Sequence, residues 1–122
     1  MVAVLGTVLL GALAVLQVLL AAGAPWGRLA WGGQHVVLPR RLRIGSATSV
    51  VLYVAIALVL LQRADAVSVL PHGLVGVLIW VLTGYFALGV VMNAVSRSRP
   101  ERLVMTPVAL ALAGSCLLLA LG

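Results

Sequence analysis

The residues of this chain that could take part in chemistry are mostly neutral polar side chains set inside apolar segments. Ser49 and Tyr53 are four residues apart in one segment, and Tyr85 and Asn93 are eight apart in another. Residues spaced by four lie on the same face of an α-helix, so each pair forms a polar stripe. Gln17 adds an amide to a third apolar segment. Such groups hydrogen-bond between packed helices or line a cavity that holds a ligand.

Both uses of these polar residues remain open from the sequence. Counted from the expected helix ends, at about 1.5 Å per residue, they fall in the inner half of a membrane. Packing between helices is the simpler interpretation, because polar side chains in membrane helices commonly hydrogen-bond to a neighbouring helix, at about 0.6 kcal/mol each. The alternative is a cytoplasm-facing cavity for a small neutral ligand or a lipid headgroup. Its predicted lining is Gln17, Ser49, Tyr53, Tyr85 and Asn93.

Catalytic and metal-binding groups are sparse. No Asp, Glu, Lys or Arg lies well inside an apolar segment, whereas proton-coupled transporters usually need an ionisable group there. His35 and His72 fall on opposite sides of an apolar segment, so about 30 Å of hydrocarbon would separate them. Cys116 is the only cysteine. We therefore expect no enzyme activity, no catalytic residue, no metal site and no cofactor.

Arginine is the second chemical feature of the chain. All eight basic residues are Arg, opposed only by Asp65 and Glu101, which gives a formal net charge of +6. Seven of the arginines lie in two polar stretches, 25–46 and 96–102. Near anionic lipid each contributes about 1 kcal/mol, so these stretches suit an interfacial anchor or a docking surface better than a nucleic-acid site. The predicted lipid- or partner-binding residues are Arg40, Arg41, Arg43, Arg97, Arg99, Arg102, Trp26 and Trp31.

The elements that must position these residues are apolar helices. The chain has 122 residues, of which 64% are hydrophobic and 8% charged. A helix needs about 20 mostly apolar residues to cross the hydrocarbon core, and four such stretches fit here. We therefore predict an all-α, four-helix transmembrane bundle that forms a single integral membrane domain over residues 1–122. The expected spans are approximately 2–23, 44–61, 74–94 and 104–122.

Local signals refine two of the connections. Thr106 followed by Pro107 is typical of a helix N-cap and first turn, so the regular part of the last helix is expected to begin at Pro107. Residues 97–105 would then lie along the interface. Pro100 and Glu101, after Ser98, give a second candidate start. In the first polar stretch, the paired glycines 32–33 permit a small hairpin between 29–31 and 34–37.

Orientation follows from the positions of the arginines. The stretches after the first and third helices hold seven of them, and the stretch after the second holds only Arg63. Positively charged connections favour the cytoplasmic side of a membrane. Both basic connections are therefore expected in the cytoplasm, and both chain termini outside it.

Two segments of the sequence are familiar in combination. They are WGGQH (31–35), continuing through LP (38–39) to LRIGS (42–46), and MNAVSRSRPER (92–102). Together they resemble a set of small four-helix integral membrane proteins of bacteria, mainly Gram-positive, that has no assigned activity. The resemblance implies a multi-pass protein of a bacterial plasma membrane. It implies no catalytic or binding residue.

These observations lead to two functional hypotheses. The first is a non-enzymatic membrane protein of unknown function that acts through a protein partner or anionic lipids at its cytoplasmic face. The alternative is a small oligomeric channel or carrier for a neutral or weakly charged solute. The expected partners are anionic lipid headgroups, with a protein partner or further copies of the chain beside them, and no nucleic acid.

Overall fold

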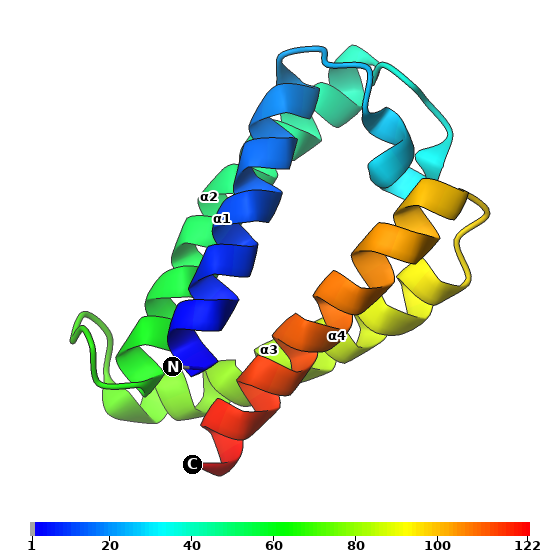
Figure 1. Ribbon diagram of the computed structural model, residues 1–122. Helices are drawn as coiled ribbons and strands as arrows, with labels where there is room; N and C mark the ends of the chain where they lie inside the picture. The colour runs from blue at the N-terminus through cyan, green and yellow to red at the C-terminus, as the bar shows by residue number, and fades with distance from the viewer. Residues whose placement is uncertain (1) are drawn as a thin grey trace.

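The computed structural model describes residues 2–122 of the chain. Each of its four α-helices is long and apolar enough to cross a membrane (Figure 1). The prediction of an all-α, four-helix architecture is therefore confirmed. The helices are α1 (Val2–Ala21), α2 (Arg40–Arg63), α3 (His72–Ala94) and α4 (Arg99–Leu121), and two 3-10 turns, η1 (Gly27–Leu29) and η2 (Trp31–Gly33), lie between α1 and α2.

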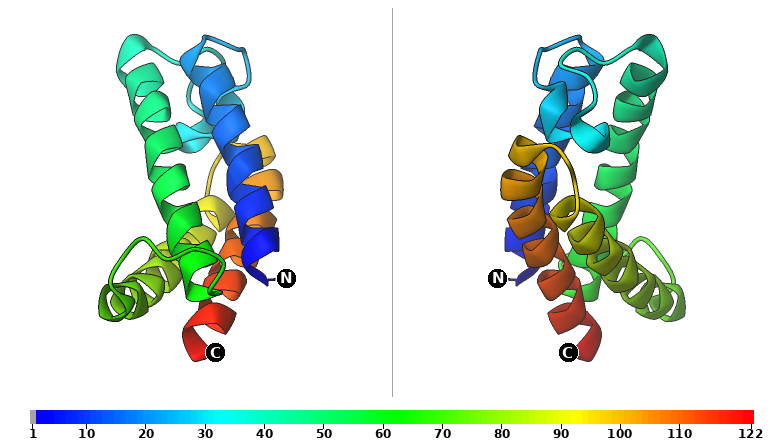
Figure 2. Two further views of the ribbon diagram at one scale, coloured as in Figure 1. Left: turned by 90° about the vertical axis from the view of Figure 1, so that its left-hand side faces the viewer. Right: turned by 90° about the vertical axis from the view of Figure 1, so that its right-hand side faces the viewer.

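The helices form two antiparallel pairs, α1 with α2 and α3 with α4 (Figure 1). The pairs meet near the α2–α3 connection, where both chain termini also lie, and we call this the terminus end. They diverge toward the opposite end, which carries η1, η2 and the first turns of α2 and α4. We call this second end the arginine end. There the two 3-10 turns pack on α4 and so bridge the two pairs (Figure 2).

A thin apolar core holds the two pairs together. Leu10, Leu60, Ile79 and Leu112, one from each helix, are at most 1% exposed. Gly6 lets α1 approach α2 closely, because a Cβ at that position would lie 2.9 Å from Leu60 Cδ1. Most other large apolar side chains are exposed on the outer faces, as expected for helices whose solvent is lipid.

Two arginines of α2 cap the C-terminal ends of neighbouring helices. Arg43 Nε donates to the carbonyl of Ala21 at 2.8 Å, at the end of α1. At the terminus end, Arg63 donates to the carbonyls of Leu119 and Ala120 at 2.8 and 3.1 Å. The last carbonyls of a helix have no partner within it and form its negative end, so a cation is favourable there. These contacts therefore tie α2 to α1 and to α4.

The start of α4 differs from the first expectation. The helix begins at Arg99 and contains Pro107, so the prediction that it begins at Pro107 is wrong and the second candidate start is confirmed. Ser98 has the extended N-cap conformation, with φ −77° and ψ 115°. Pro100 follows in the first turn, where the missing N–H costs no helical hydrogen bond. The stretch before Pro107 is therefore helical and does not lie as an irregular interfacial segment.

The other helix boundaries shift by smaller amounts. α2 begins at Arg40 and ends at Arg63, so it is longer at both ends than the predicted 44–61. Long arginine side chains can reach an aqueous layer while their backbone stays helical, so they need not end the helix. α1 ends two residues earlier than expected, at Ala21, and α3 begins two residues earlier, at His72.

The predicted hairpin in the first connection is also wrong. The segment forms η1 and η2 instead, and the one hydrogen bond that joins its two arms runs from Gly27 N to the carbonyl of Val36, at 2.7 Å. Trp31, Gly32 and Gly33 have positive φ values of 54°, 75° and 70°. Three such residues in succession curl the backbone into compact turns, so the two arms do not extend into paired strands.

Candidate functional site

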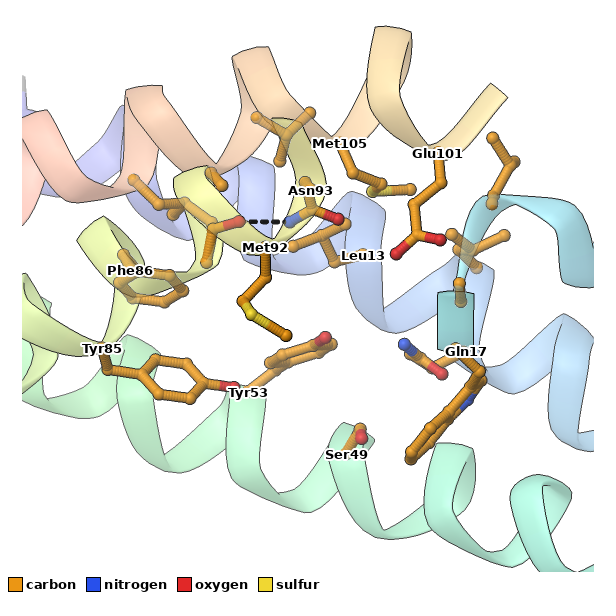
Figure 3. Close-up of a pocket in the computed structure, with 18 of the residues that line it drawn as sticks. Leu13, Gln17, Ser49, Tyr53, Tyr85, Phe86, Met92, Asn93, Glu101 and Met105 are labelled. Carbon is orange, nitrogen blue, oxygen red and sulfur yellow. Dashed lines mark hydrogen bonds between the residues drawn. The ribbon is translucent and has the colours of Figure 1, made fainter. Parts of the chain in front are cut away.

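A cavity of about 360 Å³ lies between the two helix pairs, on the side of the arginine end. All four helices and the first connection contribute to its lining (Figure 3). The five residues predicted to line a cavity are all present in it. They are Gln17 from α1, Ser49 and Tyr53 from α2, and Tyr85 and Asn93 from α3.

Two of these polar residues are hydrogen-bonded within their own helices. Ser49 Oγ donates to the carbonyl of Gly45 at 3.0 Å, and Asn93 Nδ2 donates to the carbonyl of Gly89 at 2.7 Å. Each bond reaches back four residues, a local pattern common for short polar side chains in helices. Neither residue joins two helices in the described part of the chain, so they do not act as the interhelical links of the packing hypothesis.

Gln17 and the two tyrosines are placed differently. Gln17 is 8% exposed, and its Oε1 has no hydrogen-bond partner within residues 2–122. Tyr53 is half-buried beside it, whereas Tyr85 is 50% exposed and stacks edge-on with Phe86, with 5.1 Å between ring centroids. Figure 3 shows both phenol rings and the Gln17 amide directed into the same space. The cavity therefore has a polar lining on three of its helices.

Glu101 is the residue of this site that the sequence analysis missed. It is 9% exposed, and its carboxylate points into the cavity from the first turn of α4 (Figure 3). Ser96 Oγ donates to its Oε2 at 3.1 Å, while Arg102 donates instead to the carbonyl of Ser96 at 3.2 Å. A signal was present in the sequence, because Glu101 shares a helical stripe with the cavity residues Met105 and Leu112.

Trp31 closes the cavity at the arginine end. Its indole Nε1 donates to Ser46 Oγ at 3.0 Å, and a Cβ on Gly45 would lie 2.9 Å from its ring atoms. The ring was predicted to rest among lipid headgroups, and it remains 41% exposed, but one side of it seals against α2. Trp26, which is 53% exposed and without a cavity contact, better fits the predicted anchoring role.

The predicted arginine surface divides into exposed and engaged residues. Arg43 and Arg102 are partly buried and donate to backbone carbonyls, as described above. The other four predicted arginines are exposed at the arginine end and, within residues 2–122, make no side-chain hydrogen bond. They are Arg40 and Arg41 in the first turn of α2, Arg97 in the α3–α4 connection, and Arg99 at the start of α4.

A second cavity, of about 480 Å³, lies beside the first and shares Met92 and Glu101 with it. Arg28 and Arg97 line this second cavity, so it is basic where the first is not. His35 and His72 stand at opposite ends of the molecule, and no group of three His, Cys, Asp or Glu side chains in residues 2–122 is placed to hold a metal ion.

Comparison with known proteins adds no relative to this picture. No protein-family model, curated protein or solved structure matches the chain.

Proposed function

We propose that this chain is a non-enzymatic, multi-pass protein of a bacterial plasma membrane that binds anionic lipids at its arginine end. The arginine end would face the cytoplasm, with both termini outside. The observation that supports this function is the group of four arginines, Arg40, Arg41, Arg97 and Arg99, exposed at one end and free of protein hydrogen bonds over residues 2–122.

The physical case for lipid binding rests on where these arginines lie. Two of them are in the first turn of α2 and one is the first residue of α4. Helix N-termini carry partial positive charge, so helix ends and guanidinium groups add to one positive surface. An arginine near an anionic bilayer surface contributes about 1 kcal/mol, so four together would select strongly for acidic headgroups. Exposed Trp26 provides an aromatic anchor in the same connection.

The lipid proposal predicts a loss of selectivity when the charge is removed. Replacing Arg40, Arg41, Arg97 and Arg99 together by Gln should lower the enrichment of phosphatidylglycerol over phosphatidylcholine at least about tenfold. Native mass spectrometry of the protein extracted from mixed-lipid nanodiscs measures this ratio. The matched control replaces the same four residues by Lys, which keeps the charge and should keep most of the enrichment. An unchanged ratio in the Gln variant would contradict the proposal. If a second protein instead co-purifies in fixed stoichiometry with the unmodified chain and is lost from the Gln variant, the arginines bind a protein partner.

The orientation predicts which positions an outside reagent can reach. In a Cys116→Ala background, Ser68→Cys lies in the exposed α2–α3 connection and Gln34→Cys in the exposed first connection. A membrane-impermeant maleimide applied to intact cells should label Ser68→Cys and spare Gln34→Cys until the membrane is opened. Ser98 is a poor site for this test, because it is buried and its hydroxyl donates to the carbonyl of Arg28 at 2.5 Å. The reverse labelling pattern would overturn the orientation.

A small oligomeric channel or carrier for a neutral or weakly charged solute is the second candidate function. The observation that favours it is the cavity between the helix pairs, with all five predicted polar residues in its lining. Liposome flux assays distinguish the two functions, because lipid binding alone moves no solute.

A further inference from the structure

Two buried oxygen acceptors face the cavity between the helix pairs. Gln17 Oε1 has no partner in the described chain, and Gln17 is 8% exposed. The carboxylate of Glu101, which is 9% exposed, accepts one hydrogen bond, from Ser96. Figure 3 shows both side chains directed into the same space from α1 and α4. The cavity therefore presents acceptors that the protein itself leaves underused.

Such acceptors are costly in an apolar setting unless something donates to them. A buried polar group without a partner costs about 1–3 kcal/mol, and a buried charge costs more. Gln17 Oε1 receives no hydrogen bond from residues 2–122, and lipid tails have no donor to offer. A ligand that carries hydrogen-bond donors would remove this cost. A positively charged donor would also balance the carboxylate.

The charge of the lining favours a cation over an anion. Glu101 is the one formally charged side chain among the residues that line this cavity within the described chain. Glu101 also borders the second cavity, where Arg28 and Arg97 lie, but neither of these arginines lines the first cavity, and Arg102 donates to the carbonyl of Ser96. The site that Gln17 and Glu101 share is therefore acidic, although the end of the molecule around it is basic.

The remaining lining suits an apolar body. Aromatic rings of Trp31, Tyr53 and Phe86 border the cavity, and the faces of aromatic rings attract cations. Met92 and Met105 add flexible thioethers that adapt to ligands of different shape. A volume of about 360 Å³ lies within the range of about 300–1,000 Å³ that is usual for small-molecule sites.

The cavity is open on its α3 side. Tyr85, Leu88 and Met92 line it and are 50%, 60% and 62% exposed. In a membrane-spanning helix such faces contact lipid, so a molecule dissolved in the bilayer could enter without crossing water. An amphipathic ligand, concentrated near the headgroups, would reach this opening more readily than a hydrophilic solute.

We propose that this cavity binds an amphipathic amine. Its protonated amino group donates hydrogen bonds to Glu101 and Gln17, and its apolar body packs against the aromatic and thioether side chains. The proposal requires binding only, so it holds whether or not the ligand crosses the membrane. It uses none of the four exposed arginines, so it is independent of lipid binding at the arginine end.

The test compares three probes that share one apolar body. Phenylbutylamine carries the ammonium group, phenylbutanol is its neutral analogue, and phenylbutyrate is its anionic analogue. Binding is measured by isothermal titration to the protein in phosphatidylcholine nanodiscs, with empty nanodiscs as the reference for partitioning. The uncharged-lipid background also keeps this result separate from any test of anionic lipid binding. The unmodified protein should bind the amine most tightly and phenylbutyrate least.

Variants locate the site. Glu101→Gln should weaken binding of the amine about tenfold or more and leave phenylbutanol unchanged, because it removes the charge and keeps the shape. Asp65→Asn is the matched control, because it removes the other carboxylate of the chain, exposed at the opposite end, and should change neither affinity. Gln17→Met, which keeps the side-chain length, should weaken the amine several-fold.

The outcomes are decisive in either direction. Equal affinity of the amine for Glu101→Gln and the unmodified protein would overturn the proposal, as would phenylbutanol binding as tightly as the amine. If Glu101→Gln shows no cooperative thermal transition, Gln17→Met decides, and undiminished amine binding there would equally reject the site.

Discussion

Replacing Gln62 by Leu should destabilise the protein by about 2–3 kcal/mol, because it leaves backbone groups of the α2–α3 connection without partners. Gln62 is 2% exposed. Its Oε1 accepts hydrogen bonds from the amides of Val69 and Leu70 at 3.0 and 2.7 Å, and its Nε2 donates to the carbonyl of Leu70. One side chain thus satisfies three backbone groups in a connection that has no regular structure.

The measurement is thermal unfolding in nanodiscs, combined with hydrogen exchange over residues 64–71. Gln62→Leu should lower the melting temperature by several degrees and speed exchange at Val69 and Leu70. Ser68→Ala, in the same connection but exposed, should have no effect. If Gln62→Leu has the same melting temperature as the unmodified protein, water or lipid headgroups replace the lost hydrogen-bond partners and the prediction is wrong.

This connection matters beyond local stability because it joins the two helix pairs at the end where they meet. We expect a looser α2–α3 connection to let the angle between α2 and α3 vary, and with it the space between the two helix pairs. Arg63, one residue further along the chain, ties α2 to the end of α4 at the same place. At the terminus end the two helix pairs are therefore joined both by the α2–α3 connection and by the hydrogen bonds of Arg63.

The four helices could be predicted because a membrane-spanning helix is recognised by its length and apolar composition, and both can be read from the local sequence. The boundary of α4 was not, because the stretch before it offers two serine- or threonine-led starts with a proline in each. Local preference favours neither. The choice depends on distant contacts: Ser98 donates to the carbonyl of Arg28, and a Cβ on Gly33 would lie 2.1 Å from Ser98 Cβ. No helical pattern within residues 96–107 encodes that neighbour.

The cavity, too, could be predicted in part from local sequence, while the rest depended on contacts between distant segments. Four-residue spacing identified the polar stripes, because helical periodicity determines which side chains share a face. Spacing alone could not show that the pairs diverge and leave a space between them, since that depends on the angle between helices. Glu101 was assigned to a helix start, which is correct, but burial from the first connection turned that start into part of the cavity. The one formally charged residue in the cavity lining was therefore recognised as part of a helix start and not as part of the site.

Replacing Gly27 by Ala should separate the two arms of the first connection. A Cβ at this position would lie 2.2 Å from the carbonyl oxygen of His35 and 2.8 Å from that of Val36, both backbone atoms. The same glycine donates its N–H to Val36 at 2.7 Å. Because no side-chain rotation can relieve a clash with backbone, the two arms must separate, at a cost of about 2–3 kcal/mol.

Hydrogen exchange over residues 25–39 measures this opening directly. A loss of about 2 kcal/mol raises the open population about 30-fold, so exchange of the amide at position 27 should accelerate by a similar factor while the helices remain protected. Gly11→Ala is the matched control: beyond the local helix backbone, no atom lies within 4 Å of its Cβ position, and alanine favours a helix, so it should be neutral or slightly stabilising. Equal exchange in both variants would contradict the tight packing of this connection. Trp31 closes the cavity from the same connection. Gly27→Ala should therefore also weaken the binding of any ligand in the cavity, and Gly11→Ala should leave that binding unchanged.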